Sequence, residues 1–353
     1  MKKTRQSNIE LLRILAICGV IVLHYNGGSC NALGHVAAGS SNHWFLLGLE
    51  GLFICAVNLF ILISGYYSCT TQRREPIKAI GLLLQVMAFY GAVYLLDAFR
   101  SGTFSVTDFI ATTLPTNYFV VQYVALYLIS PYLNLALQRL SKHQLHKMIL
   151  LVVVLFSVWP TLADIGGAVR GKQFMGLNPV GLYGDDWGYT LVNFVMMYLI
   201  GAYIRLADVR VKKRYTVAAA AVYTAILALT GKYDPGTGIA WSYCNPIVIA
   251  QAVTLFLLFQ QMEFSSKIVN GLAKSVFTCF LFHGYLLRKW DAATAVQHSL
   301  LYLLAHILSA VVVIYLASWV VDKIYHFLAD PILKLIKKLL DYWKLDFSVW
   351  KES

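Results

Sequence analysis

The sequence predicts an all-α integral membrane protein, with about ten transmembrane helices around a membrane-crossing cavity and a C-terminal amphipathic interfacial helix. Of its 353 residues, 59% are hydrophobic and only 13% are charged, whereas soluble chains are about half apolar and a quarter charged. The mean hydropathy is +0.64. Apolar stretches long enough to cross a bilayer recur along the whole chain. These observations exclude a soluble enzyme and a disordered chain.

The apolar stretches predict ten membrane spans. They lie at about 8–25, 45–67, 77–98, 118–137, 147–164, 189–206, 215–231, 246–262, 271–288 and 299–322. We therefore predict one transmembrane domain over residues 1–322 and a cytoplasmic tail over 323–353. Arg13 lies inside the first span and no small-residue cleavage site follows it, so we expect a retained helix and not a signal peptide.

The distribution of basic residues predicts the orientation. With the N-terminus inside, the inner segments carry 22 of the 29 lysines and arginines and the outer loops carry six. Cytoplasmic loops of membrane proteins are rich in these residues, so both termini are expected in the cytoplasm and the protein in the cell membrane. Orientation also accounts for the net charge of +12, and nucleic acid is not an expected partner.

The tail after the last span is basic and amphipathic. Within DKIYHFLADPILKLIKKLLDYWKLDFSVW, apolar residues alternate with Lys334, Lys337 and Lys338. Such a pattern is typical of a helix that lies on the inner leaflet and contacts membrane lipid. It predicts a surface anchor without chemistry of its own.

Two ionisable residues share one face of the first span. Arg13 and His24 are eleven residues apart, which in a helix places them on the same side and roughly 16 Å apart along the axis. Ionisable side chains inside a membrane are costly and mark functional sites. A polar stripe of this length indicates a cavity that crosses most of the bilayer. In the alternative interpretation, Arg13 pairs with Glu10 and His24 lies in the outer interface.

Several motifs in order resemble the membrane-bound acyltransferase-3 family in its stand-alone form. They are R-x10-H on the first span, NLFILISGYY (58–67), QRREPIK (72–78), QYVALYLISPYLN (122–134) and FTCFLFHGYLL (277–287). The resemblance covers residues 8 to about 287. One departure is Leu59-Phe60, where the family often has two phenylalanines.

The resemblance implies an O-acyltransferase. Such an enzyme moves an acyl group, most often acetyl, from cytoplasmic acyl-CoA to a hydroxyl of an extracytoplasmic glycan or its lipid-linked precursor. The donor's phosphates need cations at the inner face, and Arg73, Arg74 and Lys78 follow the second span. Ordinary positive-inside anchoring would also explain this run. Arg13 is a further candidate contact to the donor.

Three small or aromatic polar residues of the second span are candidate contacts to the donor's pantetheine amides. They are Asn58, Ser64 and Tyr66. Small polar residues also join transmembrane helices to one another. The two roles stay open at the level of sequence.

His24 is the expected general base, because imidazole accepts protons near neutral pH and a sugar hydroxyl gains nucleophilicity as it loses its proton. A transient acyl-His24 is the alternative. His283 is predicted at a similar depth and is a candidate to orient His24 or contact the acceptor. Glu50, at the outer end of the second span, is a candidate to orient the imidazole, although interfacial solvation explains it equally well.

The outer loop 165–188 is rich in glycine and contains Asp185, Asp186 and Trp187. Aromatic and carboxylate side chains together suit sugar binding, although a solvated mobile loop is the simpler interpretation. The six cysteines show no metal-ligand spacing, so no metal cofactor is expected.

Two other functions compete with the acyltransferase. A transporter or exporter of a glycan or small molecule would also place ionisable groups within the membrane. No internal repeat of the kind found in many transporters is visible. A non-catalytic membrane component of a glycan-synthesis complex would keep the fold without needing Arg13 and His24.

Overall fold

The computed structural model describes residues 6–234 and 236–343, and within these ranges it is helical with no β-strand. The predicted all-α class is therefore confirmed. The chain divides into two compact units, which are described separately. The first comprises residues 1–68 and 141–319, and the second comprises residues 69–140 and 320–353.

The first unit contains most of the helices. In chain order they are α1 (Ser7–Asn26), α2 (Ala32–His35), α3 (Ser41–Phe53), α4 (Ala56–Ser68), α8 (Lys142–Val153), η1 (Val154–Val158), α9 (Trp159–Val169), η2 (Asp186–Gly188), α10 (Leu191–Leu206), α11 (Lys213–Tyr233), η3 (Ile239–Trp241), α12 (Pro246–Gln260), α13 (Lys267–Leu272), η4 (Ala273–Ser275), α14 (Val276–Leu287), α15 (Ala292–Ala295) and the first part of α16 (Leu300–Tyr342).

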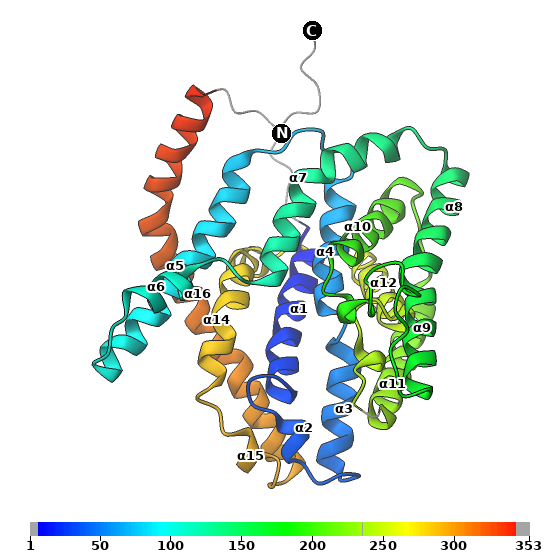
Figure 1. Ribbon diagram of the computed structural model, residues 1–353, viewed down its shortest axis with the longest axis horizontal. Coiled ribbons are helices and arrows are strands. Elements are labelled where there is room, and N and C mark those ends of the chain that lie inside the picture. Colours follow the sequence, from blue (N-terminus) through cyan, green and yellow to red (C-terminus); the bar gives the residue numbers. More distant parts are fainter. Residues whose placement is uncertain (1–5, 235, 344–353) are drawn as a thin grey trace. The chain divides into compact units, whose positions relative to one another are not determined.

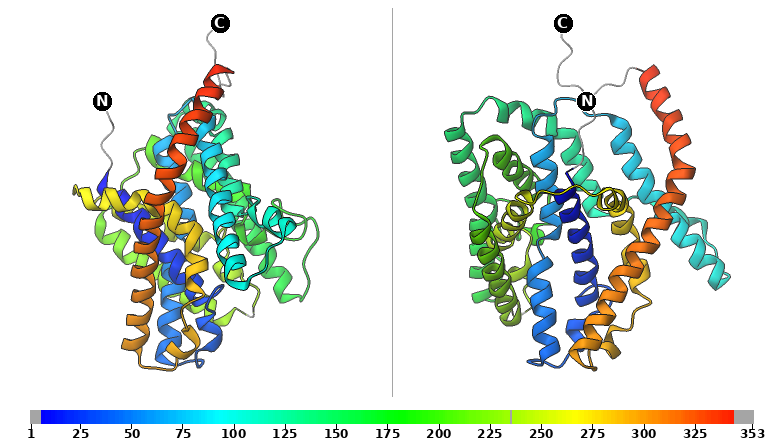
Figure 2. Two further views of the ribbon diagram at one scale, coloured as in Figure 1. Left: turned by 90° about the vertical axis from the view of Figure 1, so that its left-hand side faces the viewer. Right: turned by 180° about the vertical axis from the view of Figure 1, so that it is seen from behind.

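Helix α1 is the central helix of this unit. It packs against α3, α4 and α14, and Figures 1 and 2 show it between the α3–α4 pair on one side and α14 with the first part of α16 on the other. Apolar residues all round a helix are typical of one surrounded by protein, and Ile17, Ile21 and Tyr25 are fully buried. Arg13 and His24 thus lie on a helix that other helices flank, although Arg13 is only partly buried and His24 is exposed.

Glycines let α4 and α10 approach closely. A Cβ atom added to Gly65 would lie 2.1 Å from the Tyr198 carbonyl oxygen, and one added to Gly201 would lie 2.1 Å from that of Leu62. Such contacts are possible only without a side chain, which is why small residues line helix interfaces in membranes. The glycine of the second-span motif is thus explained by packing.

The second unit contains α5 (Pro76–Ser101), α6 (Val106–Thr113), α7 (Tyr118–Gln138) and the last part of α16. Pro76 occupies the first turn of α5, where a residue without an N–H fits because that N–H would lack a helical partner. Helix α5 packs against α6 and α7. The short segment between α4 and α5 therefore belongs to the same unit as α7.

The tail differs in one respect from the expected separate amphipathic helix. Helix α16 continues without interruption from Leu300 to Tyr342, with Pro331 inside it. Within the second unit, Tyr325 packs against Phe89 of α5 with ring centroids 5.7 Å apart. Residues 344–353 of the predicted tail lie outside the described residues. A distinct interfacial helix therefore stays a prediction.

Among the described residues, eight helical segments are long and apolar enough to cross a membrane. They are Ser7–Asn26, Ser41–Ser68, Pro76–Ser101, Tyr118–Gln138, Lys142–Val169, Lys213–Tyr233, Ile239–Gln260 and Leu300–Tyr342. The other two predicted spans form α10, with 16 residues, and α14, with 12. Both are shorter than the roughly 20 residues that span a bilayer. The membrane class is confirmed, and the number ten stays a prediction.

Candidate active site

His24 and His283 form a pair in the first unit. Their ring centroids are 4.7 Å apart and the ring planes meet at 64°. His24 comes from the C-terminal turn of α1 and is exposed, whereas His283 of α14 is buried, with 6% of its surface accessible. The structure thus brings together two histidines that are 259 positions apart in the sequence, one of them open to an approaching molecule.

The hydrogen bonds of His283 define its tautomer. Its Nδ1 lies 2.7 Å from the Phe280 carbonyl oxygen, which only accepts, so Nδ1 carries the proton. The buried Nε2 is then a lone-pair acceptor, and it has no hydrogen-bond partner among the described residues. His283 therefore offers an unused acceptor beside His24, whose ring nitrogens also lack protein partners in the described part of the chain.

Glu50 is buried near the end of α1 but is not hydrogen-bonded to His24. Its Oε2 accepts from Nδ2 of Asn26 at 2.9 Å, and the same Nδ2 donates to the Leu46 carbonyl at 3.0 Å. Asn26 is fully buried and lies two residues after His24. Glu50 thus acts on the helix end that carries His24, and not on the imidazole itself.

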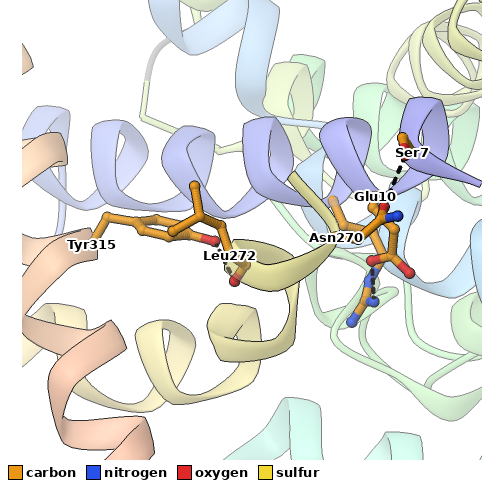
Figure 3. Close-up of polar contacts among 6 residues, drawn as sticks. Ser7, Glu10, Asn270, Leu272 and Tyr315 are labelled. Atoms are coloured by element: carbon orange, nitrogen blue, oxygen red, sulfur yellow. Dashed lines mark hydrogen bonds and ion pairs between the residues drawn. The ribbon is translucent and has the colours of Figure 1, made fainter. Parts of the chain in front are cut away.

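Arg13 is paired with Glu10, as in the alternative interpretation of the sequence. Arg13 Nη1 lies 2.9 Å from Glu10 Oε2, and 32% of the Arg13 side chain stays exposed. Figure 3 shows Glu10 one turn from Ser7, whose hydroxyl donates to Asn270 Oδ1 at 3.0 Å. The ion pair with Glu10 uses only Nη1 of Arg13. A guanidinium has five N–H donors, so Arg13 can contact another molecule while it stays paired with Glu10.

The three polar residues of the second-span motif differ in what they contact. Asn58 is fully buried, donates to the Tyr243 carbonyl at 2.7 Å and accepts from Asn193 at 3.1 Å. Ser64 donates to the carbonyl of Phe60, one turn earlier, at 2.9 Å. Asn58 thus joins α4 to neighbouring segments, the role that the sequence left as an alternative.

The Tyr66 hydroxyl accepts two hydrogen bonds near the end of α4. Arg205 Nη1 donates at 3.3 Å and Gln260 Nε2 at 2.9 Å, and the Arg205 guanidinium lies 5.2 Å above the Tyr66 ring. Tyr66 thus links the end of α4 to Arg205 of α10 and to Gln260 of α12. Sequence reasoning did not single out Arg205.

Arg74 is held in place within the second unit by two residues of α7. Its Nε donates to Ser130 Oγ at 2.9 Å, and its guanidinium lies 4.7 Å above the Tyr127 ring. Its two terminal nitrogens have no partner among the described residues. Those two nitrogens form the fork that grips a phosphate bidentately.

The Ser130-Pro131 pair explains how α7 provides this support. Pro131 has no N–H, so the Tyr127 carbonyl one turn earlier loses its helical hydrogen bond. Ser130 Oγ donates to that carbonyl at 2.8 Å and at the same time accepts from Arg74. Tyr127 and Ser130 are site residues that sequence reasoning missed, although a Ser-Pro pair inside a span was a usable signal.

The neighbours of Arg74 lie on the surface. Arg73 and Lys78 are both exposed, and the backbone before them is tied to α7 because Asn134 Nδ2 donates to the Thr71 carbonyl at 2.7 Å. The basic motif and the fourth-span motif, separate in the sequence, thus form one structural site.

The comparison with known families identifies the class of protein. A family model described as an acyltransferase domain matches residues 6–321. The chain therefore belongs to the acyltransferase-3 family, and its apolar helices make it a membrane acyltransferase. The resemblance inferred from the motifs is confirmed. No curated protein and no solved structure matched the chain.

Proposed function

We propose that the protein transfers an acetyl group from cytoplasmic acetyl-CoA to a hydroxyl of an extracytoplasmic glycan or its lipid-linked precursor. The family supports acyl transfer. The observation that carries the catalytic assignment is the exposed His24 beside a buried His283 whose free nitrogen is an acceptor.

In the proposed reaction His24 is the general base. As the acceptor oxygen bonds to the acyl carbon, the hydroxyl proton moves to His24, the carbon–sulfur bond breaks and the thiolate takes up a proton to leave as the CoA thiol. His283 orients the imidazole through its Nε2, which can accept an N–H bond from protonated His24. Glu50 acts as a positioning residue through Asn26. Transfer through an acyl-His24 intermediate uses the same geometry.

The donor is proposed to meet Arg74 first. A guanidinium held by stacking and by its Nε keeps a fixed direction for the two nitrogens that face a phosphate. Arg73 and Lys78 add positive charge nearby, and Arg13, paired with Glu10, is proposed to contact a polar part of the donor. Ser64 and Tyr66 are proposed contacts to the pantetheine chain. Asn58 is a weaker candidate because protein groups occupy its amide.

The proposal includes the orientation inferred from the basic residues, with both termini in the cytoplasm and the protein in the cell membrane. Acyl-CoA carries phosphates and does not cross a bilayer freely. In the proposed orientation the donor therefore enters the protein from the cytoplasmic side, and the acceptor binds from the outer side.

The test is to purify the full chain in lipid nanodiscs and measure binding and slow hydrolysis of acetyl-CoA. Glycans of cells with and without the protein are then compared by mass. The proposal expects acetyl-CoA binding by the protein, and it expects the glycan of cells without the protein to lack acetyl groups that are present in cells with it. A protein that neither binds nor hydrolyses acetyl-CoA would contradict it.

A further inference from the structure

A cavity of about 440 Å³ lies in the first unit between the end of α9, the loop 170–188 and the segment 237–242. This volume falls within the roughly 300–1,000 Å³ of small-molecule sites. Its walls include Thr161, Asp164, Asn178, Asp185 and Trp187. None of the residues to which we assign the donor or the base lines it.

The wall formed by α9 is shaped by a local change of helix type. Residues Val154–Val158 form a π-helix, and Pro160 follows in the first turn of α9. Ser157 Oγ donates to the Cys244 carbonyl at 2.6 Å, and Trp159 Nε1 donates to the Leu177 carbonyl at 2.9 Å. Single π-turns occur often at functional sites, and here one fixes α9 against both loops that close the cavity.

One buried hydroxyl on the cavity wall is unsatisfied. Thr161 Oγ1 has no hydrogen-bond partner among the described residues, and Thr161 is only 8% exposed. Asn178, which is 7% exposed, interacts with the carboxylate of Asp164 on the same wall. Burying a hydroxyl without a partner is unfavourable, and a ligand hydroxyl in the cavity would give Thr161 the partner that it lacks.

Trp187, which also lines the cavity, is held in an unusual backbone conformation. Asp186 and Trp187 have φ angles of 49° and 53°, a region that non-glycine residues rarely adopt and that often marks a functional site. Trp187 Nε1 donates to the Thr237 carbonyl at 3.0 Å, yet the residue stays 53% exposed. Its ring is thus fixed at one edge and still open to a ligand.

The charged groups of the wall are mainly acidic. Asp164, Asp185 and Asp186 line the cavity together with one cation, Lys172. The Lys172 ammonium lies 5.9 Å from the Phe174 ring centre. Excess negative charge in a cleft repels an anionic ligand and leaves a neutral one unaffected.

We propose that this cavity binds a neutral sugar unit of the acceptor glycan and discriminates against acidic sugars. Carboxylates, an amide and a hydroxyl would hydrogen-bond the sugar hydroxyls, and the indole of Trp187 would pack on the C–H face of the ring. This inference rests on the proposed function, because it assigns a substrate class to that reaction.

Glu50 is near both the cavity loop and the end of α1. Tyr189, two residues after Trp187, interacts with Glu50 electrostatically. Glu50 also accepts a hydrogen bond from Asn26, two residues after His24.

The test measures direct binding without acyl-CoA. The full chain in nanodiscs is titrated calorimetrically with neutral trisaccharides of glucose, galactose, mannose or N-acetylglucosamine, and with trigalacturonate as the acidic probe. At least one neutral probe is expected to bind, and trigalacturonate to bind at least tenfold more weakly. Thr161→Val is the main variant, because it removes the unpaired hydroxyl while keeping the shape.

Thr161→Val is expected to weaken binding of the neutral probe about five- to tenfold. It should not lower the melting temperature, since the lost hydroxyl has no partner in the described part of the chain. A hydroxyl with a structural role would instead lower the melting temperature and leave binding unchanged. Trp187→Phe should weaken binding, whereas Trp44→Phe, the same change in α3 outside the cavity, should not. The proposal would be overturned if no neutral probe bound, or if trigalacturonate bound more tightly than the neutral probes. It would also be overturned if Thr161→Val bound the neutral probe as tightly as the unchanged protein.

The two proposals can fail separately. His24→Ala is expected to abolish acyl transfer and to keep neutral-sugar binding. Retained transfer in that variant would contradict the role of His24 while leaving the cavity result intact. Weaker sugar binding by Thr161→Val, together with loss of acyl transfer in His24→Ala, would support both proposals.

Discussion

Replacing Arg74 with lysine tests the support that α7 gives to the proposed donor site. Arg74→Lys keeps the charge but loses the Nε bond to Ser130 at 2.9 Å and the planar contact with the Tyr127 ring at 4.7 Å. It also loses the paired terminal nitrogens that are proposed to contact a phosphate of the donor. A charge-assisted hydrogen bond is worth about 1.5–3 kcal/mol, which we reduce to about 1–2 kcal/mol because Arg74 is partly exposed. The KM for acetyl-CoA should rise roughly 5- to 30-fold.

The assay is acetyl-CoA hydrolysis by the purified chain over a range of donor concentrations. Arg73→Lys is the matched control, because it makes the same change at the exposed neighbouring position, and its KM should rise less than about threefold. Ser130→Ala, which leaves the Arg74 charge intact, should raise the KM in the same direction as Arg74→Lys. Equal effects at positions 73 and 74, or no effect of Ser130→Ala, would refute the reasoning.

Two further predictions concern orientation and the loop beside the cavity. In a cysteine-free background, a cysteine at position 73 should react with an impermeant reagent only after the membrane is opened, because this basic loop is predicted to face the cytoplasm; labelling of intact cells would contradict this. Burial alone would raise the pKa of Asp234, but hydrogen bonds from the Thr237 hydroxyl and from the backbone N–H groups of Ala240, Thr237 and Gly238 outweigh it and lower the pKa. A carboxylate with a lowered folded-state pKa stabilises the loop above the unfolded pKa of about 3.9, and this contribution is lost as the pH falls through the folded value. Amide exchange of Thr237, Gly238 and Ala240, corrected for intrinsic rates, should therefore accelerate in acid, and Asp234→Asn should accelerate it at neutral pH; unchanged exchange in the variant would refute the role of the carboxylate.

Much of the fold could be predicted because hydrophobic length is a strong signal in membrane proteins. Long apolar segments, such as the one that forms α1, could be predicted to be helical because a segment that crosses a bilayer must hydrogen-bond its own backbone groups. Helices α10 and α14 have only 16 and 12 residues, so length alone does not identify them as spans. The uninterrupted course of α16 through Pro331 could not be predicted, because proline normally ends or bends a helix.

The residues of the candidate site could be proposed from the sequence, but their contacts could not. His24 stood out because an ionisable group in an apolar helix is costly, but its proximity to His283 depends on how α1 packs on α14. For Asn58 the sequence left two roles open, and the structure shows the hydrogen bonds that the helix-joining role requires. Thr161 could not have been found from the sequence, because a hydroxyl becomes unsatisfied only when the folded chain buries it away from water.

Removal of the His24 imidazole tests the central claim most directly. His24→Ala should reduce acetyl transfer to the acceptor by roughly 10²–10⁴-fold, as expected for loss of a general base, with membrane insertion and acetyl-CoA affinity retained. Arg13→Ala, which alters the partner of Glu10 roughly 16 Å along the same helix, should instead weaken donor binding. The measurement is the rate of transfer alongside the Kd for acetyl-CoA in the two variants. Near-normal transfer by His24→Ala, or loss of its acetyl-CoA binding, would contradict the assignment of His24 as the base.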